Sequence, residues 1–254
     1  MRTKWHYLPG CCLLLCALIL LSVGAIPQYA NYHTFADTSP FFGIPNAMDV
    51  LSNLPFALAG LWGVIAWMRI FVNSQVRIRS ADFAYLMFIL SILATGFGSA
   101  FYHLAPDDAR LFWDRLPIAL ACASLLAAVH AECLCRRADL LASLELIALL
   151  ILAVASVIWW QRTGDLRLYL GLQAMSILLI PIWQWIYQAP RPSRLTFAIA
   201  IAFYVVAKLT ETYDVAILAQ TGGISGHTIK HLLASGAAAL IIGHYLHLIR
   251  KRSQ

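Results

Sequence analysis

Charge is what this sequence has least of. Only 12% of its 254 residues are Asp, Glu, Lys or Arg, whereas 61% are hydrophobic. A water-soluble domain of this length needs much more polar surface, so the composition excludes that class and predicts a protein that crosses a membrane several times. Long polar linkers are also missing, and we therefore expect one integral membrane domain to make up most of the chain.

The spacing of the cysteines and the distribution of positive charge exclude other classes of protein. The six cysteines never form the paired CxxC motifs of a zinc ribbon. The formal charge of +6 comes from short basic clusters between apolar runs, a pattern typical of membrane topology. We therefore expect no nucleic-acid partner, and nothing in the sequence determines an oligomeric state.

Eight apolar stretches are long enough to cross a bilayer, which takes about 20 helical residues. They cover roughly 9–27, 47–68, 82–104, 111–133, 139–160, 166–187, 195–218 and 227–249. We predict an all-α, polytopic membrane helix bundle with a seven-helix core, residues 40–250, preceded by one N-terminal helix or leader, residues 1–30. That first segment fits either a retained anchor or a signal peptide, and the absence of a clear small-x-small cleavage site favours the anchor.

Positive charges predict the orientation of the chain. The basic residues gather on alternate loops, namely Arg2 and Lys4; Arg69, Arg77 and Arg79; Arg136 and Arg137; Arg191 and Arg194; and Arg250, Lys251 and Arg252. The positive-inside rule makes that side cytoplasmic, and the C-terminus with it. The opposite helix ends, which carry the residues considered next, then face the non-cytoplasmic side.

Three histidines at helix ends form the most informative pattern. His103 closes one predicted span, and His227 and His231 open the last one. Ionisable groups at membrane depth are costly and therefore indicate function. Residues four apart share one helical face, so His227 and His231 can offer two imidazoles to one metal ion. With His103 as the third ligand, a tetrahedral zinc would keep one open position, as catalytic sites do.

A carboxylate and a hydroxyl accompany the histidines. Asp114, eleven residues after His103, is a candidate general base or a partner that orients water or a ligand. Ser99 shares a face with His103 and can donate a hydrogen bond to a developing oxyanion, or position the water. Ser99 could instead be a nucleophile, but no histidine base remains for it if His103 binds metal.

Simpler interpretations stand beside these. Two histidines with HxxxH spacing also occur as ordinary interfacial residues. Lys208 and Glu211 lie three apart within an apolar span, which favours a structural ion pair over a catalytic role. Lys230, between two candidate ligands, is expected to reach the membrane interface.

The combination of Ser99-x3-His103, Asp114 and His227-x3-His231 resembles the alkaline ceramidase family. This family belongs to a superfamily that also includes progestin and adiponectin receptors and lipases that remodel GPI anchors. The stretch from Ile44 to Phe56, with its polar residues Asn46, Asp49, Ser52 and Asn53, looks like the start of the family's first core helix. The resemblance covers about 40–250, all seven core helices.

The resemblance implies a zinc-dependent hydrolase. His103, His227 and His231 would bind zinc, Asp114 would act as the base, and Ser99 would stabilise the oxyanion. The implied substrate is a ceramide-like membrane lipid, whose amide bond is hydrolysed to a fatty acid and a sphingoid base. The family's acidic calcium-binding cluster is reduced here to Asp37 and Asp49, with Asn46 in place of an acidic residue, which makes calcium dependence doubtful.

Two other functions stay open at this stage. An ester lipase acting on phospholipids would pass through the same tetrahedral oxyanion, so the residues do not separate amide from ester hydrolysis. A receptor or transporter with structural zinc would share the three histidines. Short loops and scattered glycines and prolines argue against a transporter with broken helices.

Overall fold

The computed structural model describes residues 7–73, 77–134 and 140–253. Within these ranges the chain is helical and forms no β-strand, only two isolated bridges. Seven helices there are long and apolar enough to cross a bilayer, so the chain is a multi-pass membrane protein. The predicted all-α bundle is confirmed. Arg2, Lys4, Arg136 and Arg137, which carry part of the predicted orientation, lie outside the described residues.

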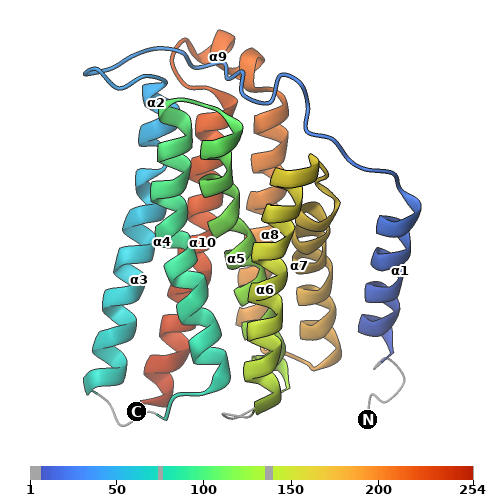
Figure 1. Ribbon diagram of the computed structural model, residues 1–254. Coiled ribbons are helices and arrows are strands. Elements are labelled where there is room, and N and C mark those ends of the chain that lie inside the picture. Colours follow the sequence, from blue (N-terminus) through green and yellow to red (C-terminus); the bar gives the residue numbers. More distant parts are fainter. Residues whose placement is uncertain (1–6, 74–76, 135–139, 254) are drawn as a thin grey trace. The chain divides into compact units, whose positions relative to one another are not determined.

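The helices follow one another along the chain with short connections, except for the long segment 23–46 between α1 and α2 (Figure 1). They are α1 (Leu8–Ser22), α2 (Ala47–Leu51), α3 (Leu54–Asn73), α4 (Ser80–Leu104), α5 (Asp108–Cys133), α6 (Leu140–Thr163), α7 (Arg167–Ile186), α8 (Arg191–Thr212), α9 (Asp214–Thr221) and α10 (Gly226–Arg252).

Two predicted spans differ from the observed helices. The span predicted at 195–218 begins earlier, at Arg191, and ends at Thr212, where Tyr213 leaves the helical conformation and α9 begins. Most residues from Lys208 to Asp214 are polar, so the sequence did carry a signal for the helix end. The helix predicted at 9–27 ends at Ser22 because the backbone is extended at Val23. At 15 residues, α1 is only about 22 Å long, less than the hydrocarbon core of a bilayer.

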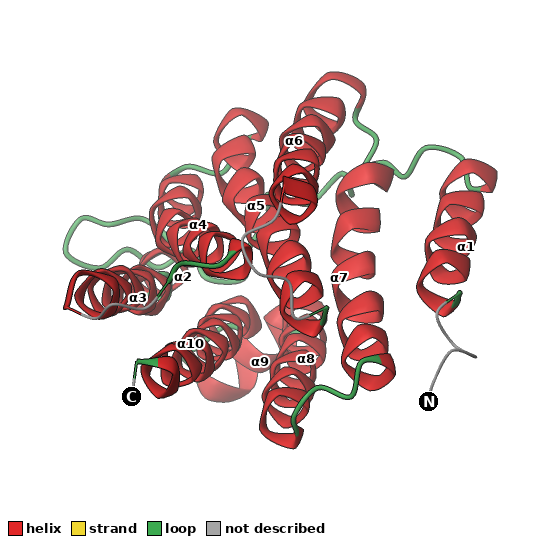
Figure 2. Cartoon of the chain, turned by 90° about the horizontal axis from the view of Figure 1, so that it is seen from below, coloured by secondary structure: helices red, strands yellow, loops and turns green. Residues whose placement is uncertain are grey.

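The chain divides into two compact units. Unit 1 comprises 1–28, 75–88 and 119–197, and unit 2 comprises 29–74, 89–118 and 198–254. In unit 1, α7 packs against both α1 and α6 (Figure 2). In unit 2, α10 packs along α3 and also contacts α2 and α9. All the candidate site residues named above belong to unit 2.

Asp165 and Arg167 attach the end of α1 within unit 1. The Arg167 guanidinium donates hydrogen bonds to the carbonyls of Leu20 (3.1 Å) and Val23 (2.8 Å), and Asp165 Oδ1 accepts one from the Ile26 N–H (3.1 Å). Burial alone would raise the pKa of Asp165, but the hydrogen bonds from Arg167, Ile26 and Trp159 outweigh burial and lower that pKa to about 2. The carboxylate is therefore a fixed part of this attachment.

Candidate metal centre

The three predicted histidines come together in unit 2. One nitrogen of each imidazole lies within 4.8 Å of the others, and His103 Nε2 is 3.2 Å from His227 Nε2. All three side chains are buried, with 1%, 5% and 4% exposure for His103, His227 and His231. Two nitrogens on one tetrahedral zinc lie about 3.3 Å apart, given Zn–N bonds of about 2.0–2.1 Å. The cluster therefore has the donor atoms and the spacing to hold a metal ion.

The start of α10 is fixed by two hydrogen bonds to its first turn. The Ser225 side chain accepts one from the Thr228 N–H (2.9 Å), and Asp214 Oδ1 accepts one from the His227 N–H (2.7 Å). The N–H groups of a first turn lack helical partners, so such caps stabilise the helix start. Gly226 allows α8 to approach, because a Cβ at this position would overlap the Thr210 carbonyl oxygen. His227 is thereby held in place through its backbone.

Ser52 orients the imidazole of His231. Its hydroxyl donates to the Asp49 carbonyl oxygen (3.0 Å) and lies 2.7 Å from His231 Nδ1. With its one proton used in this way, the hydroxyl oxygen accepts from the His231 Nδ1–H. This arrangement places the lone pair of His231 on Nε2, the nitrogen left to bind metal.

Two further polar residues of the 44–56 stretch contact the histidine-bearing helices. Asp49 is fully buried, and its Oδ1 accepts hydrogen bonds from the hydroxyls of Ser225 (3.0 Å) and Thr228 (2.8 Å). The Asn46 amide donates to the His103 carbonyl (2.8 Å). From the sequence, Asn46 and Asp49 were considered only for a doubtful calcium site, although the grouping of polar residues at the start of an apolar span was a signal for such contacts.

Ser99 and Asp114 are also brought together. Ser99 is buried one turn before His103, and its hydroxyl interacts with the half-buried Asp114 carboxylate on α5. The close approach depends on Gly98, since a Cβ there would overlap the Trp113 carbonyl oxygen. In a regular helix the Trp113 carbonyl would accept a hydrogen bond from the N–H four residues later. That residue is Pro117, which has no N–H, so the oxygen can face α4.

Phe35 was not predicted from the sequence. Its ring centroid lies 4.6 Å from those of His103 and His227, in edge-on geometry. The neighbouring Ala36 N–H donates to Asp214 Oδ2 (3.0 Å), so the same carboxylate holds this segment and the start of α10. Phe35 therefore covers part of the histidine cluster. Phe35 is one of several aromatic residues in the loop before α2, and no motif distinguishes it from the others.

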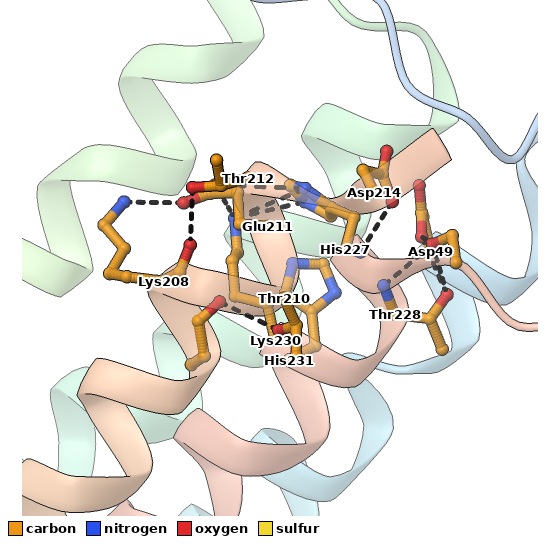
Figure 3. Close-up of polar contacts among 12 residues, drawn as sticks. Asp49, Lys208, Thr210, Glu211, Thr212, Asp214, His227, Thr228, Lys230 and His231 are labelled. Atoms are coloured by element: carbon orange, nitrogen blue, oxygen red, sulfur yellow. Dashed lines mark hydrogen bonds and ion pairs between the residues drawn. The ribbon is translucent and has the colours of Figure 1, made fainter. Parts of the chain in front are cut away.

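Three charged side chains border the cluster (Figure 3). Lys208 pairs with Glu211 Oε2 (2.6 Å), which confirms the predicted ion pair. Glu211 Oε1 also pairs with Lys230 (2.6 Å), and Lys230 Nζ lies 3.2 Å from His227 Nε2. Glu211 thus holds the ammonium group of Lys230 beside the imidazole, and the expectation that Lys230 reaches the membrane interface stays a prediction.

The acidic residues considered for calcium have other partners. Asp37 accepts hydrogen bonds from the N–H groups of Ser39 and Met48, and Asp49 accepts from two hydroxyls as described above. Among the described residues, the three histidines form the one group of His, Cys, Asp or Glu side chains close enough together to hold an ion. The structure thus offers a metal site at the histidines.

A comparison with models of known protein families, and a second with curated proteins, found no match to this chain.

Proposed function

We propose that the protein is a zinc-dependent membrane hydrolase that cleaves the amide bond of ceramide-like lipids. The observation that carries this proposal is the buried three-histidine cluster, with a hydroxyl–carboxylate pair, Ser99 and Asp114, in the same unit. Three neutral nitrogen donors leave a coordination position open on zinc, which suits catalysis better than a purely structural role. The resemblance to alkaline ceramidases supports the same chemistry.

Each group in the site has a separate role in the proposed hydrolysis. Zinc, when bound, supplies a Lewis acid that polarises water and the substrate carbonyl. Asp114 takes one proton from the attacking water as the water oxygen bonds to the carbonyl carbon, and the C–N bond then breaks as that proton passes to the departing nitrogen. The second proton of the water passes from the new carboxylic acid to the amine, so the products are a carboxylate and an ammonium ion. Ser99 orients Asp114 or turns about its Cβ to donate to the carbonyl oxygen.

The location of the site supports a lipid substrate. The histidines lie at the ends of membrane-spanning helices and are nearly inaccessible, and Phe35 covers two of them. The amide bond of a ceramide lies just below its headgroup, at a comparable depth. A water-soluble amide would gain nothing from a site in such a position.

The test is fatty-acid release from ceramides and phospholipids by the purified protein in detergent, with the metal content measured in parallel. Asp114→Asn should keep its metal and lose about 10²-fold or more of the wild-type rate, since it no longer accepts the proton. Asp107→Asn, an exposed carboxylate just before the same helix that pairs with Arg110, is the matched control and should retain full activity.

The other outcomes separate the alternatives. If fatty acid is released from phospholipids alone, the protein is an ester lipase that uses the same residues, and the amidase proposal is wrong. One bound metal per chain without release from any lipid would overturn the proposal in favour of a receptor or transporter with structural zinc.

A further inference from the structure

Lys230 occupies an unexpected place for a lysine near a helix end. Such side chains usually extend along the apolar surface until the ammonium reaches water. Here Nζ lies 3.2 Å from His227 Nε2 and 3.5 Å from His227 Nδ1. His227 Nε2 is also the atom 3.2 Å from His103 Nε2, so the positive charge lies at the metal-binding side of the cluster.

Glu211 holds the lysine there without fully neutralising it. One carboxylate pairs with two ammonium groups, Lys208 on Oε2 and Lys230 on Oε1, both at 2.6 Å (Figure 3). Two positive charges and one negative charge leave a net charge of +1 on these three side chains. The Lys208 side chain is 56% exposed and that of Lys230 only 22%, so the charge on Lys230 is the less screened of the two.

We propose that Lys230 is a catalytic residue, whose ammonium group binds the negative charge that develops on the substrate's carbonyl oxygen and then the carboxylate of the released fatty acid. Glu211 and Lys208 are positioning residues that keep it at the cluster. The inference rests on the proposed function and adds a charged donor for the oxygen to which Ser99 offers a neutral hydroxyl.

The chemistry requires only a fixed charge. Lys230 forms no covalent bond and keeps its protons, while the proton from water follows the route through Asp114 already described. An oriented cation in a site that excludes water stabilises an oxyanion more strongly than a neutral hydroxyl does. Lys230 also acts electrostatically on the Asp114 carboxylate, which places it near the base as well as near the ligands.

The first measurement is turnover of Lys230→Gln and Lys230→Arg, each with its metal content determined. Lys230→Gln should retain one metal per chain and lose about 10²-fold in kcat, the usual effect of removing one oxyanion donor. Lys230→Arg restores the charge and should recover to within about tenfold of wild type, since guanidinium differs from ammonium in shape. Lys251→Gln, at the other end of α10, is the matched control and should be unaffected.

A second measurement does not depend on turnover. The protein is loaded with cobalt and titrated with octanoate, and binding is followed by the visible absorption of the metal. Lys230→Gln should weaken octanoate binding about tenfold, as expected for the loss of one charge-assisted hydrogen bond. Glu211→Gln should weaken it less, because Lys230 keeps its charge but loses its anchor.

The outcomes distinguish this inference from the proposed function. If Lys230→Gln keeps its metal and both its kcat and its octanoate affinity stay within about twofold of wild type, the inference is wrong and the hydrolase proposal stands. If the wild-type protein hydrolyses no lipid amide, the proposed function fails, and the octanoate titration still decides whether Lys230 binds a carboxylate.

Discussion

Histidine occurs in the two units in opposite surroundings. In unit 1, His130 has an acidic partner and an aromatic neighbour. Its Nδ1 pairs with Glu145 (2.6 Å), and its ring stacks on Trp183 at 4.3 Å between centroids. In unit 2, His103, His227 and His231 turn ring nitrogens toward one another, with no carboxylate within salt-bridge distance of His103 or His231 among the described residues. A histidine paired with an acid stabilises a fold, whereas three imidazoles that face one another can share a metal ion.

The largest expected difference between the two environments is in metal content. His231→Ala should abolish metal binding and reduce lipid hydrolysis to background, because two histidines remain where zinc needs at least three protein ligands. His130→Gln should lower thermal stability and keep one metal per chain. Metal analysis of the two purified variants checks this. A His231→Ala protein that still holds one metal per chain would show that the three histidines are not the ligand set.

A smaller effect is expected from a change at Ser52, which orients the candidate metal ligand His231. Ser52→Ala removes the acceptor for His231 Nδ1–H, and the loss of such a contact typically costs about 10–100-fold in metal affinity. Competition with a chelator of known affinity measures the change. Ser176→Ala is the matched control, since this buried hydroxyl in unit 1 bonds to the carbonyls of Cys122 and Leu172 and to the Cys122 thiol. Equal affinities in both variants would mean that packing alone orients His231.

The smallest expected effect is the contribution of Asp165, in unit 1, to the pH dependence of stability. The pKa of Asp165 is lowered to about 2, so its carboxylate stabilises the folded state at neutral pH. That contribution is lost as the pH falls from about 4, the ordinary value for Asp, towards about 2. Asp165→Asn should lower Tm at pH 6, and the difference from wild type should shrink below pH 4. Metal content should not change. A Tm difference that stays constant down to the lowest pH measured would contradict this role for Asp165.

Several features could be predicted from local patterns because they depend only on neighbours in the chain. Apolar runs of about 20 residues identified the membrane helices. Helical periodicity placed Ser99 with His103 and His227 with His231, and i,i+3 spacing identified the Lys208–Glu211 pair. The break at Tyr213 was missed because the prediction joined the apolar residues from Val215 to Leu218 to the preceding span, across the polar residues Thr210, Glu211, Thr212 and Asp214. The side of the membrane that the histidines face stays a prediction.

The sequence by itself determined the membrane class, the helical architecture and the residue types of a metal site, since length, hydropathy and helical spacing are local properties. Only the tertiary structure decided which side chains complete that site. Ser52 and Asp49 contact the start of α10 across 176 to 179 residues of chain, and Glu211 holds Lys230 beside the histidines. Such contacts arise from the packing of one helix against another, and no spacing within a single helix specifies them.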